Sequence, residues 1–158
     1  MILLKARSTV TLGVALTGLA LAAVSAHAEE CQGPPGAAKI SIVIEGVRSD
    51  KGLMTASLYP GARSQFLIKD GALKVWSVPA QAPITRMCIW RSPGIYAVAV
   101  YHDANVVHRF NVGLFGPTQD YGFSNNPRIM FSKPSFQSVK FEVKAGEATV
   151  HIRLNRHA

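Results

Sequence analysis

The segment Pro93-Gly94-Ile95-Tyr96-Ala97-Val98-Ala99-Val100-Tyr101-His102-Asp103 decides the fold class. It opens with a Pro-Gly turn signal, and the residues from Ile95 to Tyr101 carry no charge. Valine and tyrosine favour strands, and a run that is apolar on both faces predicts a strand that is covered on both sides or lies in the middle of a sheet. The chain must therefore supply further strands on either side of it.

Two segments before this strand alternate between apolar and polar residues, as half-buried strands do. They cover residues 39–47 and 53–59, and Asp50-Lys51-Gly52 between them is a tight turn signal. The spacing predicts a hairpin. The side chains expected to point inward are Ile40, Ile42, Ile44, Met54, Ala56 and Leu58, and those expected to point outward are Thr55, Ser57 and Tyr59.

Two further short strands are predicted at residues 73–78 and 83–90. Pro79 and Pro83 place them at an edge or a bend, because proline cannot donate a hydrogen bond to a central ladder. Residues 63–70 are compatible with either a short helix or an irregular loop.

The C-terminal part of the chain alternates again over residues 136–143 and 148–154, which predicts a hairpin turned at Ala145-Gly146. About seven short strands without a long helix indicate an all-β fold, either a β-sandwich of the immunoglobulin-like or prealbumin-like kind or a small barrel. The sandwich is the preferred reading.

The N-terminus has the pattern of a secretory signal. Lys5 and Arg7 precede an uncharged apolar run, Val10 to Val24, and Ala26-His27-Ala28 has small residues at both positions that a signal peptidase reads. A membrane anchor is the alternative, but polar residues near the end of the run disfavour it. The predicted parts of the chain are a signal peptide at 1–28, an N-terminal tail at 29–38 and a single β-sandwich domain at 39–158.

The predicted compartment is therefore periplasmic or secreted, with no membrane span after cleavage. The full chain has 17 Lys and Arg residues against 9 Asp and Glu residues, and the net charge stays positive without Lys5 and Arg7. These basic residues form no run, so a solvated surface is the simplest interpretation, although contact with anionic envelope polymers or lipid head groups fits the sign. Nucleic acid is not an expected partner, and no cofactor is predicted.

Cys31 and Cys88 are the two cysteines of the chain. In an oxidising compartment two cysteines pair by default, so a disulfide is predicted that ties the N-terminal tail to a strand. The alternative is that both are free and Cys88 is simply buried.

The stretch from His102 to Pro134 has no sustained period and is punctuated by Gly and Pro, and long loops of this kind are usually functional or wrapped on the surface. It holds the residue types of a nucleophilic triad, His102, Asp103 and Ser124. Adjacent residues of a strand point to opposite faces, however, and no glycine elbow surrounds the serine, so an enzyme is not predicted. His102 is instead expected to bond a loop carbonyl, and no histidine pair has the spacing of a zinc site.

The segment Tyr121-Gly122-Phe123-Ser124-Asn125-Asn126 combines aromatic and amide groups, which can stack on sugars or clamp an extended peptide. Arg128 could add a contact to an anion. The alternative is that the two aromatic rings plug the end of the sandwich and the asparagines adopt left-handed turn geometry.

Four segments of the chain together resemble a family of uncharacterised exported bacterial proteins. The segments are Gly46-Val47-Arg48-Ser49-Asp50-Lys51-Gly52, Pro93 to Asp103, Tyr121 to Asn126, and Pro134-Ser135-Phe136. The second segment is also similar to transthyretin-like and carboxypeptidase-regulatory-like sandwiches. The resemblance implies a sandwich fold and an exported protein, but no chemistry.

Members of that family tend to continue from the His-Asp pair with a loop of the form Asp-x-Asn-x-Asn-Gly-x-x-Asp, which resembles a calcium loop. Asp103 and Asn105 keep that pattern, whereas Val107, His108 and Asn111 replace an oxygen ligand, the glycine and a carboxylate. No metal is therefore expected. Hydrogen bonds from Asp103 and Asn111 to backbone amides are expected to hold the loop instead.

The sequence thus predicts an exported, non-enzymatic binding or envelope-associated module that uses the 102–136 loop, with envelope glycans, peptides or anionic surface polymers as partners. The rival is a metal-binding protein or enzyme that uses the same loop. The candidate ligand-binding residues are His102, Asp103, Asn105, Tyr121, Phe123, Ser124, Asn125, Asn126 and Arg128.

Overall fold

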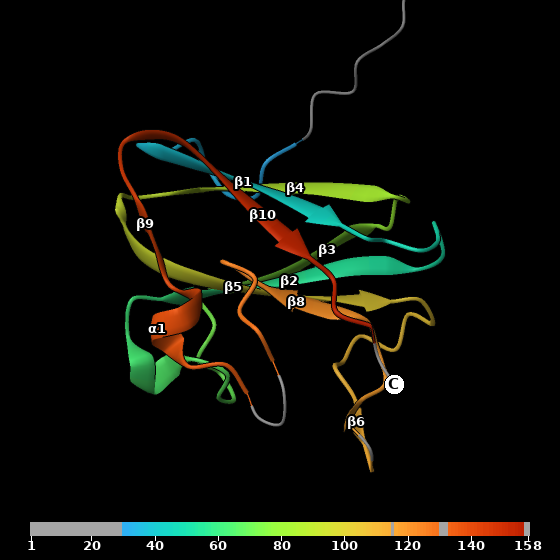
Figure 1. Cartoon of the computed structure of the whole chain (residues 1–158). Helices are drawn as coiled ribbons and strands as arrows, with labels where there is room; N and C mark the ends of the chain where they lie inside the picture. The colour runs from blue at the N-terminus through green and yellow to red at the C-terminus, as the bar shows by residue number, and fades with distance from the viewer. Residues whose placement is uncertain (1–29, 115, 130–132, 157–158) are drawn as a thin grey trace, which may run out of the picture.

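The computed structural model describes residues 30–114, 116–129 and 133–156, so the predicted signal peptide at 1–28 lies outside the described residues. Two β-sheets face each other across a core (Figure 1). This arrangement confirms the all-β sandwich. No helix in the described ranges is long and apolar enough to cross a membrane.

The smaller sheet has three strands in the order β10-β1-β4. Its members are β1 (Ala38–Glu45), β4 (Ile84–Arg91) and β10 (Gly146–Arg153). The strand β1 pairs antiparallel with β4 and parallel with β10, so the first and last long strands of the domain are neighbours.

The larger sheet has the order β3-β2-β5-β8, and β9 pairs with the other half of the same edge of β5. Its members are β2 (Leu53–Pro60), β3 (Lys74–Pro79), β5 (Gly94–Asp103), β8 (Tyr121–Phe123) and β9 (Phe141–Val143). The apolar segment that predicted a central strand is β5, which confirms the prediction. The two strands flanked by proline, β3 and β4, are both edge strands, as expected.

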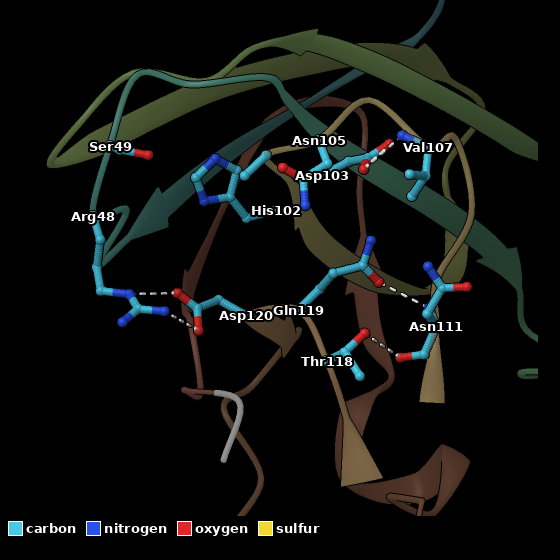
Figure 2. Close-up of a pocket in the computed structure, with 11 residues that line it drawn as sticks. Arg48, Ser49, His102, Asp103, Asn105, Val107, Asn111, Thr118, Gln119 and Asp120 are labelled. Carbon is cyan, nitrogen blue, oxygen red and sulfur yellow. Dashed lines mark hydrogen bonds and ion pairs between the residues drawn. The ribbon is translucent and has the colours of Figure 1, made fainter. Parts of the chain in front are cut away.

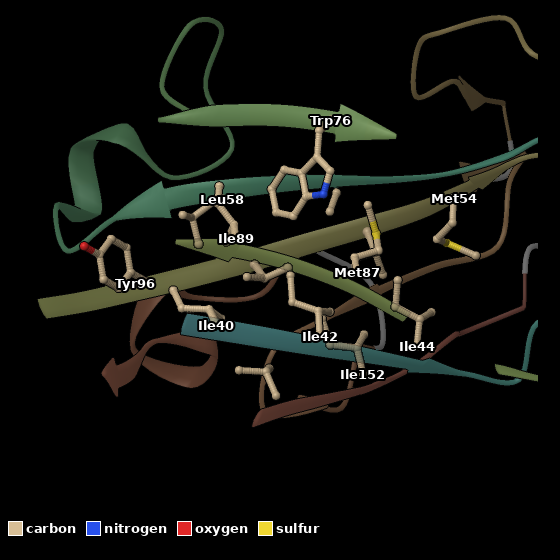
Figure 3. Close-up of a cluster of buried hydrophobic side chains, with 14 of the residues drawn as sticks. Ile40, Ile42, Ile44, Met54, Leu58, Trp76, Met87, Ile89, Tyr96 and Ile152 are labelled. Carbon is tan, nitrogen blue, oxygen red and sulfur yellow. The ribbon is translucent and has the colours of Figure 1, made fainter. Parts of the chain in front are cut away.

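The predicted inward side chains of β1 and β2 form the centre of the core, and all six are fully buried. Trp76, Met87, Ile89, Tyr96 and Ile152 pack around them between the two sheets (Figure 3). Burying one isoleucine stabilises a fold by roughly 1.5–3 kcal/mol, so this cluster is the main source of stability.

Thr55 and Tyr59 lie on the face of β2 opposite the core, as predicted, but both are buried because other segments cover that face. The outer face of the larger sheet carries a second apolar cluster, in which Tyr59 packs with Phe123 and Phe136. The short elements η1 (Arg63–Gln65) and α1 (Phe136–Val139) lie beside this face (Figure 1). Alternation identified the strand, but distant segments decided what covers its second face.

The free energy of unfolding is expected to fall as the pH rises above 10.0. In the Tyr59→Phe variant, the same rise in pH is expected to lower the free energy of unfolding less. Burial raises the pKa of Tyr59, an effect that its hydrogen bond with Ser57 opposes. The folded state disfavours the phenolate, so stability is complete below 10.0, where an ordinary tyrosine ionises, and declines as the pH approaches the raised folded value.

Urea unfolding at several pH values on both sides of 10.0 measures this effect. Burial also raises the pKa of Tyr101, so part of the decline persists in the variant. Equal alkaline slopes in the variant and the unaltered protein would contradict the assignment.

Both predicted hairpins are wrong. The strands β1 and β2 lie in different sheets and face each other across the core, because residues 46–52 cross from one sheet to the other. At the C-terminus, residues 136–143 split into α1 and β9, and β9 pairs with β5 while β10 pairs with β1. The Ser135 hydroxyl caps α1 by accepting a hydrogen bond from Ser138 N at 3.2 Å.

The predicted disulfide between Cys31 and Cys88 is confirmed. Beside it, Gln32 N donates to Cys88 O and Trp90 N donates to Gln32 O, each at 3.0 Å. The N-terminal tail therefore covers part of the outer edge of β4.

Candidate functional site

A pocket of about 420 Å³ opens at one end of the sandwich, where three segments meet. These are the β1–β2 connection, the end of β5 and the excursion, by which we mean residues 104–119 (Figure 2). The excursion contains the short strands β6 (Val112–Gly113) and β7 (Gly116–Pro117). The lining residues are Arg48, Ser49, His102, Asp103, Ala104, Asn105, Val107, Asn111, Thr118, Gln119 and Asp120.

Three of the predicted site residues, His102, Asp103 and Asn105, line this pocket. Tyr121, Phe123, Ser124, Asn125, Asn126 and Arg128 do not. The structure thus divides the predicted site into a pocket at the end of β5 and a separate segment after it.

The imidazole of His102 is buried, and its Nε2 lies 2.7 Å from Lys51 O. This bond confirms the expected contact with a loop carbonyl. It requires the β1–β2 connection to lie close against β5, and Gly52 makes this possible: its φ is +71°, and a Cβ there would lie 2.2 Å from Asp103 O. His102 therefore holds the connection in place.

The carboxylate of Asp103 is fully buried and organises the start of the excursion. Its Oδ1 accepts from Val107 N at 3.0 Å, and its Oδ2 accepts from His108 N at 2.6 Å. These bonds offset the unfavourable left-handed backbone of Val106 and His108, where φ is 53° and 56°. The prediction that Asp103 holds the loop through backbone amides is confirmed.

The same prediction for Asn111 is wrong, because its backbone rather than its side chain makes the contacts. Asn111 N donates to Gln119 Oε1 at 2.8 Å, and Thr118 N donates to Asn111 O at 3.1 Å. Gln119 Nε2 also donates to Arg109 O at 3.0 Å. Gln119 thus bridges the two arms of the excursion.

Arg48 and Asp120 form an ion pair at the side of the pocket. The guanidinium donates twice, from Nε to Oδ2 at 2.8 Å and from Nη2 to Oδ1 at 2.9 Å. Asp120 is only 4% exposed, so the paired charge compensates for the burial of its carboxylate. The pair connects segments 72 residues apart, and sequence reasoning missed it because neither residue has a local pattern.

The pocket also has uncharged polar side chains, and that of Thr118 donates to Asn111 O at 3.4 Å. Ser49, Asn105 and Asn111 face the pocket, and their side chains make no hydrogen bond with any described residue. Figure 2 shows Ser49 on one side of His102 and Asn111 on the other. The free hydrogen-bonding capacity of the pocket therefore lies in amide and hydroxyl groups.

Ser124 lies away from the pocket and is fully buried. Its hydroxyl donates to Val139 O at 2.5 Å and accepts from Val98 N at 3.0 Å. The serine therefore ties the end of α1 to β5, and it shares no hydrogen bond with His102 or Asp103.

Asn125 and Asn126 adopt the left-handed geometry of the alternative interpretation, with φ of 62° and 48°. Asn125 Nδ2 donates to Lys140 O at 2.7 Å. Asn126 Nδ2 donates to His151 O at 3.0 Å, and its Oδ1 accepts from Arg153 N at 2.7 Å. Asn126 thus links the segment after β8 to β10 of the opposite sheet, while Arg128 nearby in the sequence is exposed.

Tyr121 and Phe123 belong to a row of aromatic rings on the outer face of the larger sheet. Phe110 of the excursion packs against Tyr101 and Tyr121, with ring centroids 5.6 and 5.9 Å away. Tyr121 in turn lies 5.9 Å from Phe123. The row anchors the root of the excursion to the sheet.

His102, Asp103 and Ser124, the residues with the types of a nucleophilic triad, thus all make hydrogen bonds within the fold. Among the described residues, no three or more His, Cys, Asp and Glu side chains gather so as to hold a metal ion. The arrangement suits hydrogen bonding to a ligand better than proton transfer.

No curated protein and no solved structure matches this chain. A family model does match it, over residues 42–151, a range that runs from β1 to β10 and includes the pocket. The family is described as "Uncharacterized protein conserved in bacteria (DUF2141)", and the chain belongs to it.

Proposed function

We propose that the protein is an exported, non-enzymatic binding module that takes an uncharged polar ligand, a glycan of the cell envelope, in the pocket at the end of β5. The observation that carries the proposal is a difference between the ionisable and the neutral polar side chains of the pocket. The ionisable groups hold the fold together, and the neutral groups have free hydrogen-bonding capacity.

Three ionisable residues of the pocket already have partners within the fold. His102 bonds the Lys51 carbonyl, Asp103 accepts two backbone N–H groups, and Asp120 pairs with Arg48. A general base or nucleophile needs to reach a substrate with its reactive atom. His102 Nε2 and the carboxylate oxygens of Asp103 and Asp120 already have partners whose loss would open the loop or the connection, which argues against catalysis.

The neutral side chains with free hydrogen-bonding capacity are those of Ser49, Asn105 and Asn111. An amide offers both a donor and an acceptor, and a hydroxyl does the same, which matches the hydroxyl and acetamido groups of sugars. Peptide backbone has similar groups, so a peptide is the second ligand class to test. A pocket of about 420 Å³ is large enough for a sugar unit.

Export is proposed on two grounds. The pattern of residues 1–28 is that of a cleavable signal, and the disulfide between Cys31 and Cys88 suits an oxidising compartment. The periplasm or the cell surface would bring the pocket into contact with envelope glycans.

We expect the Asn105→Ala/Asn111→Ala double variant to bind the ligand about tenfold more weakly, because each hydrogen bond contributes about 0.5–1.5 kcal/mol. Glycan and peptide arrays identify the ligand, and calorimetry measures its affinity for each protein. Gln137→Ala is the matched control, since Gln137 is an exposed amide on α1, away from the pocket.

Equal weakening in the control would show that the pocket is not the binding site. Stoichiometric zinc or calcium in the purified protein, with no array ligand, would support the rival metal protein. A selective peptide in place of a glycan would keep the module and correct its ligand class.

A further inference from the structure

The middle of the excursion is a hairpin whose tip projects beyond the two sheets (Figure 1). The short strands β6 and β7 form the tip, and its apolar side chains face solvent: Val112 is 67% exposed and Leu114 is 92% exposed. Leu114 is the most exposed large apolar residue among those described. Side chains of this size are normally covered at least in part, so its exposure is unusual.

The excursion carries one formal positive charge, that of Arg109, and no formal negative charge. No Asp or Glu occurs between Ala104 and Gln119, whereas His108 and Arg109 in that stretch are both exposed. The carboxylates at either end do not change this sign at the surface. Asp103 is fully buried, and Asp120 is neutralised by Arg48.

The base of the tip is held in shape before any partner binds. Gln119 bridges its two arms through Asn111 N and Arg109 O, and Phe110 packs between Tyr101 and Tyr121 at its root. A preformed base lowers the conformational entropy that the hairpin loses when it binds.

The shape of this surface distinguishes a membrane from a folded protein as its partner. A stable protein interface buries about 1,000 Å² or more, and the end of a hairpin whose strands β6 and β7 have two residues each is too small to provide it. The interfacial zone of a bilayer accepts an isolated apolar tip, and anionic head groups attract the exposed Arg109 behind it.

From these observations we propose that the β6–β7 tip inserts Val112 and Leu114 below the head groups of an anionic lipid surface, with Arg109 at the level of the phosphates. The protein then sits peripherally on the membrane. This surface is separate from the pocket, so either proposal can fail without the other.

The test is flotation of the purified, oxidised protein with vesicles of equal parts phosphatidylglycerol and phosphatidylcholine, compared with vesicles of phosphatidylcholine alone. The Val112→Glu/Leu114→Glu variant is expected to partition about tenfold more weakly onto the anionic vesicles. Val75→Glu is the matched control, because Val75 on edge strand β3 is also exposed, at 56%. All proteins carry the same N-terminus, so any contribution from the apolar Val10–Val24 segment cancels.

A second measurement uses Leu114→Trp, which keeps the tip apolar. Its fluorescence is expected to shift to the blue on anionic vesicles and to retain part of that shift in 0.5 M NaCl, where purely electrostatic attachment is screened. Unchanged circular dichroism across the variants excludes misfolding as the cause.

Three results would overturn the proposal. In the first, the tip variant floats as well as the unaltered protein. In the second, flotation vanishes in 0.5 M NaCl and is insensitive to Leu114, which means attachment by charge alone. In the third, sedimentation shows a dimer that Val112→Glu/Leu114→Glu dissociates, without vesicle binding, which assigns the tip to a second copy of the chain.

Discussion

Replacing Cys31 and Cys88 together with alanine is expected to lower the free energy of unfolding by about 4 kcal/mol. The disulfide closes a loop of 57 residues, and the chain-entropy model converts a loop of that length into this penalty. The loss is a large fraction of the roughly 5–15 kcal/mol by which a whole domain is stable. Urea unfolding of the variant and the unaltered protein measures it.

The unaltered protein in excess reductant is the natural control and is expected to unfold at the same urea concentration as the variant. A second consequence is structural. Without the covalent link, the contacts of Gln32 with Cys88 and Trp90 are free to break, which exposes the edge of β4. We therefore expect the variant to associate at high concentration, and a loss of less than 1 kcal/mol without association would contradict this account.

Replacing Asp103 with alanine is expected to cost about 3 kcal/mol and to loosen the excursion. The change leaves Val107 N and His108 N without their acceptor, and a hydrogen bond to a charged group is worth about 1.5–3 kcal/mol. The left-handed backbone of Val106 and His108 then loses its support. Hydrogen exchange of the Val107 and His108 amides should become faster than the lower global stability alone explains.

Asp50→Ala provides the comparison for that experiment. Asp50 also accepts a backbone hydrogen bond, from Ala82 N at 2.6 Å, but it is exposed, so water replaces the lost partner. We expect a cost below about 1 kcal/mol. Similar costs in the two variants would mean that the burial of Asp103 is not what makes its carboxylate important.

The faces of the strands could be predicted from the sequence, whereas their partners could not. Alternation with period two places Ile42 and Met54 in the core whatever strand lies beside them. It does not distinguish a tight hairpin from a crossover between sheets, and both Asp50-Lys51-Gly52 and Ala145-Gly146 turned out to be crossovers. The helix α1 was missed because four residues are too few to show a period of 3.6.

Only some of the residues that line the pocket could be predicted from the sequence. The His-Asp pair at the end of a central strand identified His102, Asp103 and Asn105, and the expected roles of the first two were right. Arg48 and Asp120 meet through a contact across 72 residues that no local pattern encodes. The segment from Tyr121 to Asn126 drew attention for its composition, although much of that composition serves the fold.

The parallel pairing of β1 with β10 also bears on how the chain acquires its structure. The smaller sheet stays incomplete until residues 146–153 are available, because among the described residues β10 is what pairs with that side of β1. Such long-range pairing makes folding slow and late. The smaller sheet is therefore complete only after residues 146–153 have been synthesised, so a shorter nascent chain lacks one of its three strands.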